Sequence, residues 1–80
     1  MKQKAYHIKW IDSAGNFGWQ GVSEEYTPAQ CESIGFLVKE SKDCITIALN
    51  RATDEGNAPY GELMTIPKIA IKRKKQIKFD

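Results

Sequence analysis

The chain has 80 residues, 41% of them apolar and 28% charged, which suits a single small domain over residues 1–80 with a thin core. This length excludes a Rossmann domain, a TIM barrel and a kinase lobe, and no apolar stretch approaches the roughly 20 residues of a membrane-spanning helix. The net charge of +2 divides into +3 over residues 1–11, −6 over 12–67 and +5 over 68–80. The basic ends can therefore attract an anionic partner or the acidic middle of a second copy.

The apolar residues favour strands, because β-branched isoleucine outnumbers leucine nine to three. The first predicted strand covers residues 4–11, in which Tyr6, Ile8 and Trp10 alternate with polar residues and share one face. The Asp, Asn and Gly residues of 12–18 are typical of a turn.

Two structures fit residues 19–26, a short strand and an irregular arm, and the sequence leaves both open. Thr27 and Pro28 interrupt any strand, because proline has no backbone N–H to donate. Proline also suits the first position of a helix, so a single helical turn that starts at Thr27 is an alternative.

Residues 30–40 and 44–51 are predicted to form a β-hairpin with a tight connection at 41–43. The predicted apolar faces are Ile34, Phe36 and Val38 in the first strand and Ile45, Ile47 and Leu49 in the second. Gly35 lies on the other face of its strand, where it lets the strand bend or another backbone approach.

Residues 53–61 are expected to form a loop, because Gly, Asn and Pro interrupt them. A fourth strand is expected over 61–66, and Pro67 either ends it or places it at a sheet edge. A short corner follows at 68–70. Residues 71–79 form a fifth strand with the character of a lysine-guarded sheet edge. The expected fold is therefore all-β, with about five strands.

The order of these strands resembles the small SH3-like barrels and, among them, the Sm-like (LSm) arrangement. The stretches that carry the resemblance are 32–38, 45–49 and 64–71. It implies a five-stranded small barrel, closed or nearly closed. The Sm family's polar signature after strand two and its Arg-Gly turn are absent, and Ile66-Pro67-Lys68 stands in place of that turn. The uridine-binding residues of that family therefore have no counterparts in this chain.

A second resemblance spans most of the chain. It is carried by residues 10–13, 18–19, 31–38 and 64–68, which resemble short uncharacterised proteins of bacteriophages and prophages. The resemblance implies a viral or prophage origin and an accessory role, and it implies no particular activity.

The two cysteines, Cys31 and Cys44, are too few for a disulfide scaffold or a zinc site. We expect both to be half-buried reduced thiols, since the predicted hairpin places them too far apart for an intrachain disulfide. The N-terminus has no apolar signal segment. These features predict the reducing cytoplasm of a host cell.

Three features contain residue types that are used in catalysis or ligand binding, but none forms a convergent constellation. His7, the only histidine, has no orienting third group for a dyad with either cysteine. Glycines at positions 15, 18 and 21 are not followed by the helix that a phosphate-binding loop needs. The acidic pairs at 24–25 and 54–55 lie in separate loops. We therefore expect no enzyme activity, catalytic residue, metal or cofactor.

Two groups of residues are candidates for binding. Lysines neutralise phosphates, so the basic fifth strand is a candidate nucleic-acid or nucleotide site. Its residues are Lys72, Arg73, Lys74, Lys75 and Lys78. The first loop is flanked by the aromatic residues Trp10, Phe17 and Trp19. These mark a partner-binding patch if they are exposed, whereas the alternative is that Trp10 and one other fill the core.

The function we expect is that of a phage or prophage accessory binding module without enzyme activity, which acts through protein interaction or assembly as a homo-oligomer. One alternative is an Sm-like nucleic-acid binder that uses the basic strand. Another is a phage counter-defence sponge for a small nucleotide signal. No membrane partner is expected.

Overall fold

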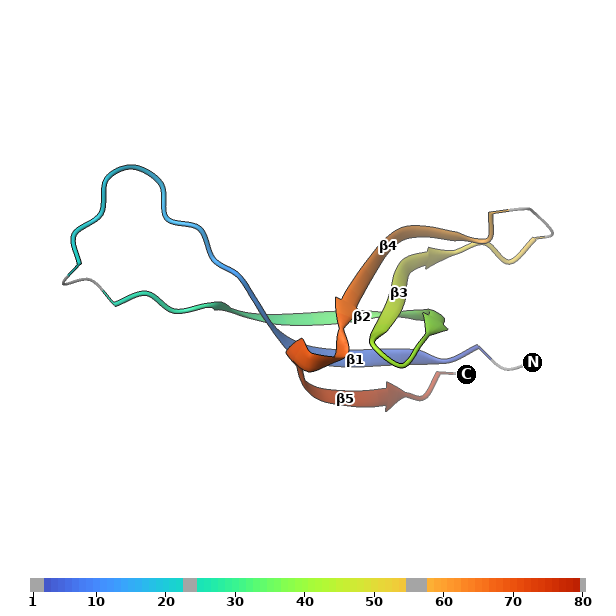
Figure 1. Ribbon diagram of the computed structural model, residues 1–80. Helices are drawn as coiled ribbons and strands as arrows, with labels where there is room; N and C mark the ends of the chain where they lie inside the picture. The colour runs from blue at the N-terminus through green and yellow to red at the C-terminus, as the bar shows by residue number, and fades with distance from the viewer. Residues whose placement is uncertain (1–2, 23–24, 55–57, 80) are drawn as a thin grey trace.

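One five-stranded antiparallel sheet makes up the fold, in the strand order β4-β3-β2-β1-β5 (Figure 1). The computed structural model describes residues 3–22, 25–54 and 58–79. The elements are β1 (Ala5–Asp12), β2 (Ala29–Glu40), β3 (Cys44–Arg51), β4 (Tyr60–Pro67), the 3₁₀ turn η1 (Lys68–Ala70) and β5 (Ile71–Ile77). The all-β prediction is confirmed, and the predicted strands match the observed ones within about two residues at each end.

The sheet is curled but open. Its two edges are β4 and β5, which do not pair with each other within the described residues, so closure into a barrel is not confirmed. The curl is strong enough to bring the Ser33 hydroxyl of β2 within 3.8 Å of the Met64 sulfur of β4, although β3 lies between these strands in the sheet. The inner face of the curl therefore forms a concave surface.

The core lies on this inner face. Its buried residues are Tyr6, Ile8, Ile45, Ile47 and Ile66, with Trp10, Leu37 and Ile71 packed against them. The three isoleucines at 8, 45 and 66 are completely buried. Cross-strand pairs such as Ile45 with Ile66 account for this, because directly opposite residues project from the same face.

The predicted apolar face of β2 is wrong. Gly35 and Leu37 face the core, whereas Ile34 is exposed and Phe36 packs on the outer face with Phe79, their ring centroids 5.9 Å apart. Phe36 lies opposite buried alanines on both neighbouring strands, which creates a small second cluster there. Both faces of β2 carry apolar residues, so alternation alone does not identify the inner one. A bulge at Val38 also breaks the alternation.

Residues 13–28 join β1 to β2, and those that the structure describes, 13–22 and 25–28, extend away from the sheet (Figure 1). We call them the arm. Its described residues contain no helix or strand, so the irregular form is confirmed for them and the helical turn at Thr27 is wrong. The radius of gyration is 16.2 Å, compared with about 12 Å for a compact domain of this length. The arm thus adds length without covering the core.

Glu40, at the end of β2, ties the sheet to its last strand. One carboxylate oxygen lies 2.8 Å from the Lys68 ammonium and 3.0 Å from the Lys74 ammonium. Hydrogen bonds from Lys68 and Lys74 hold the pKa of Glu40 below its usual value. Such partly exposed pairs stabilise a fold by about 0.2–1 kcal/mol each.

This network makes a pH-dependent contribution to stability. Because the folded pKa of Glu40 is lower than the unfolded one, the contribution is complete above the unfolded pKa of about 4.3 and is lost as the pH falls through the folded value. We expect Glu40→Gln to destabilise the protein at pH 7 and to have a smaller effect at about pH 3. Urea unfolding at both pH values measures this. The control Glu25→Gln, on the arm, should show no such difference, and an equal Glu40→Gln effect at both pH values would contradict the expectation.

Candidate binding site

The arm carries three apolar side chains that contact almost nothing. Phe17, Trp19 and Val22 have exposed fractions of 93%, 104% and 101%. Large apolar side chains gathered on one exposed segment are typical of a surface that another molecule covers. The alternative that Phe17 or Trp19 fills the core is therefore wrong.

Trp10 does not belong to this patch. It lies in β1, is half-buried, and packs against the core. Its indole N–H donates a hydrogen bond to the Ser33 hydroxyl over 3.0 Å. The structure thus divides the three predicted aromatic residues between the core, for Trp10, and the arm, for Phe17 and Trp19.

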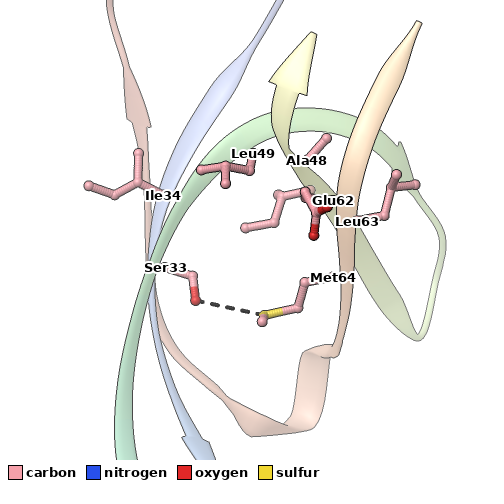
Figure 2. Close-up of a pocket in the computed structure, with 8 residues that line it drawn as sticks. Ser33, Ile34, Ala48, Leu49, Glu62, Leu63 and Met64 are labelled. Carbon is pink, nitrogen blue, oxygen red and sulfur yellow. Dashed lines mark hydrogen bonds between the residues drawn. The ribbon is translucent and has the colours of Figure 1, made fainter. Parts of the chain in front are cut away.

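A hollow of about 320 Å³ opens on the concave face between β2 and the β3–β4 pair (Figure 2). Its lining residues are Ser33, Ile34, Ile47, Ala48, Leu49, Glu62, Leu63 and Met64. Leu49, Leu63 and Met64 are large apolar residues that remain substantially exposed. Leu49 was predicted to share the core face with Ile45 and Ile47, but the core ends before it and its side chain projects into the hollow.

Glu62 is the unusual residue of this hollow. Its φ of 58° lies in the left-handed region that favours glycine, a conformation that costs a non-glycine residue about 1–2 kcal/mol. Its carboxylate points into the hollow beside Met64 (Figure 2). None of the ion pairs in the described part of the chain includes Glu62. Strain of this kind is retained at sites where the side-chain position matters.

Sequence reasoning missed the hollow. One signal was available: Glu62 is a single acidic residue that leads the apolar run of β4, and Leu63 and Met64 add apolar surface that so small a core cannot hold. Neither residue type indicates a concave site by itself. The site exists only because the curl of the sheet brings β4 near β2.

The residues of the predicted basic site have different neighbours and therefore different roles. Lys74 pairs with Glu40 and lies over the Tyr6 ring, 5.0 Å from its centroid. Its ammonium group therefore stabilises the fold. Lys72 donates a hydrogen bond to the Gln30 side chain over 3.4 Å. Arg73 lies opposite Lys9, and this pair shares the outer face of the sheet.

Lys75 lies opposite His7 on that same outer face, and Lys78 follows the end of β5. The His7 ring lies 2.7 Å from a Glu32 carboxylate oxygen, which puts one acidic group beside the cations. The strip that remains is Lys9, Arg73 and Lys75. Lys9 had not been singled out from the sequence.

The residues considered for chemistry stay apart. Cys31 and Cys44 are free and half-buried, as predicted. The nearest polar contact of the Cys44 sulfur is the Ser41 hydroxyl at 3.3 Å, whereas His7 contacts Glu32. Within residues 3–22, 25–54 and 58–79, no cluster of three or more His, Cys, Asp or Glu side chains suits a metal ion.

The predicted acidic pairs at 24–25 and 54–55 lie partly outside the described residues. Of the three glycines, Gly18 adopts a positive φ of 84°, a conformation that glycine reaches without steric cost. No helix in the described part of the chain is long and apolar enough to cross a membrane. Comparison with protein-family models, curated proteins and solved structures finds no match to this chain.

Proposed function

We propose that this chain is an accessory binding module of a bacteriophage or prophage that self-associates in the host cytoplasm and works through protein interaction rather than catalysis. One observation carries the proposal: the arm projects from the sheet with Phe17, Trp19 and Val22 almost fully exposed. Covering a large apolar side chain contributes about 1.5–3 kcal/mol. An arm of this kind therefore gains most of its stabilisation from a second molecule.

Two further features support self-association. β4 and β5 are free edges, and β5 carries four cations where β4 carries one acidic residue, Glu62. A free edge can accept a strand from another molecule. We also propose that the sheet is an open form of the SH3-like or Sm-like barrel, which the strand order and the short η1 turn between its two edge strands support.

The test is size exclusion with light scattering over a range of protein concentrations. We expect the wild-type mass to rise above the 9.1 kDa of one chain to a defined multiple, and Trp19→Ala to weaken association about 30-fold, as loss of an aromatic hot spot does. The matched control is Ile69→Ala, because Ile69 is equally exposed but lies in η1. A wild-type protein that stays monomeric at high concentration and low salt would overturn the proposal.

A second candidate function is nucleic-acid binding by the strip of Lys9, Arg73 and Lys75. Their shared outer face favours it, because three neighbouring cations can follow a phosphate backbone. Absorbance at 260 and 280 nm across the same chromatographic peak discriminates between the candidates. Excess absorbance at 260 nm that disappears at high salt would favour nucleic acid or a small nucleotide, and a clean protein spectrum favours the protein interaction.

A further inference from the structure

We propose that the hollow between β2 and the β3–β4 pair is the receptor for the arm of a second copy, with Trp19 inserted into it and Glu62 as the hydrogen-bond acceptor for its indole. Two copies would exchange arms reciprocally. This inference rests on the proposed self-association and names the surface that the arm contacts.

The arm cannot fill the hollow of its own chain in this fold. It leaves the sheet at Asp12 and returns at Ala29, and its described residues extend away from β3 and β4 (Figure 1). The molecule is 54 Å long and only 24 by 23 Å across, and the arm accounts for the added length. The occupant therefore comes from another molecule. A second copy supplies one arm for each hollow.

The hollow is chemically suited to an aromatic side chain. Its volume of about 320 Å³ lies at the lower end of the range for ligand sites, about 300–1,000 Å³. Ile47, Leu49 and Met64 provide apolar walls. The Met64 thioether also makes favourable contacts with aromatic rings. Only Glu62 and Ser33 add polar groups.

Glu62 selects tryptophan over phenylalanine. An indole N–H only donates, and it needs an acceptor when it is buried. Trp10 already has one in its own chain, the Ser33 hydroxyl, whereas the fully exposed Trp19 has its indole in water. The Glu62 carboxylate faces the hollow and is held there by a strained backbone. A bond from an N–H to a carboxylate is stronger than a neutral one.

The area favours reciprocal exchange over insertion of a single arm. Phe17 and Trp19 bury about 150–250 Å² each when covered. With an equal area on the receptor, two exchanged arms bury about 1,200–2,000 Å², which is the range of stable interfaces. One arm alone buries half of this, which is typical of weak contacts. Each chain carries one arm and one hollow, as a two-fold dimer requires.

Blocking the hollow tests the inference. We expect Leu49→Asp to weaken association at least about 30-fold, because it places a charge where the indole inserts. The control Asn50→Asp adds the same charge at the next residue, which projects from the opposite face of β3, and should change the dissociation constant less than about threefold. Far-ultraviolet circular dichroism verifies that both variants are folded.

A mixing experiment distinguishes this inference from the proposed function. Trp19→Ala keeps the hollow, and Leu49→Asp keeps the arm, so the two variants should form a mixed dimer with one engaged arm. Its affinity should lie between those of the wild type and of either variant alone. If Trp19→Ala abolishes association but Leu49→Asp does not, the arm binds elsewhere and the hollow is excluded. If neither variant changes the mass of an associated wild type, the proposed self-association holds but neither the arm nor the hollow mediates it, and this inference fails.

The role of Glu62 has its own test. In a double-mutant cycle, Trp19→Phe should weaken association about tenfold when Glu62 is present and less than about threefold in the Glu62→Gly background. Glycine relieves the positive φ, so Glu62→Gly should not lower the unfolding temperature of the dilute monomer. Equal effects of Trp19→Phe in both backgrounds would overturn the assigned hydrogen bond.

Discussion

Replacing Ile66 with alanine will lower the unfolding free energy by about 2–5 kcal/mol, among the largest stability losses that we expect from a single side chain. Ile66 is completely buried and lies opposite Ile45, so its removal leaves a cavity between β3 and β4. A domain of this size has a total stability of only about 4–12 kcal/mol. Urea unfolding followed by circular dichroism measures the loss.

The matched control lies three residues along the chain. Ile69 has an exposed fraction of 97%, compared with 0% for Ile66. Ile69→Ala should therefore change the unfolding free energy by less than about 0.5 kcal/mol. A loss at position 66 no greater than that at 69 would show that the core lies elsewhere than on the inner face of the curl.

Gly35→Ala will separate β2 from β3. A Cβ atom at position 35 would lie 2.8 Å from the carbonyl oxygen of Ala48 and 3.0 Å from the Cβ of Ile47. Neither atom can rotate away, so the strands themselves must move, at a cost of about 1–3 kcal/mol. The movement would also displace Leu49, which lies one residue beyond Ala48 and lines the hollow. We therefore expect lower stability together with weaker self-association.

Gly61→Ala is the control for this substitution. A Cβ atom at position 61 would have its nearest neighbour at 3.9 Å, the Cβ of Asn50, which is an ordinary contact. The same substitution there lowers the conformational entropy of the unfolded chain. It should therefore be neutral or stabilise the protein by up to about 1 kcal/mol. Thermal unfolding of both variants measures the difference, and equal melting temperatures would contradict the close approach at Gly35.

The strands were predictable because their signals are local. Alternation in residues 4–11, the polar connection at 41–43 and Pro67 each act over a few neighbours, so their boundaries can be obtained without knowing the fold. The inward face of β2 was not predictable. Ile34 and Phe36 are larger and more apolar than Gly35, yet β2 turns Gly35 inward, because the curl brings β3 too close for a side chain.

The candidate site, like the fold, was predictable from the sequence only in part. Phe17 and Trp19 could be identified as candidates from the sequence, because they lie in a turn-rich segment without a strand pattern. The sequence did not indicate whether their side chains are buried or exposed. The basic strand was equally visible, but the use of Lys74 by Glu40 and Tyr6 depends on residues more than thirty positions away. The hollow had one weak local signal, the acidic Glu62 ahead of Leu63 and Met64, which does not indicate a concave surface.

The sequence by itself thus determined the all-β class, the strand boundaries and the segregation of charge, because backbone propensity and side-chain alternation depend on adjacent residues. Only the tertiary structure decided which faces are buried, that the arm projects with Trp19 exposed, and that Glu62 and Met64 of β4 face Ser33 of β2 across a concave surface. These outcomes depend on how far the sheet curls. That curl results from bulges and close approaches between strands distant in sequence, which no local pattern encodes.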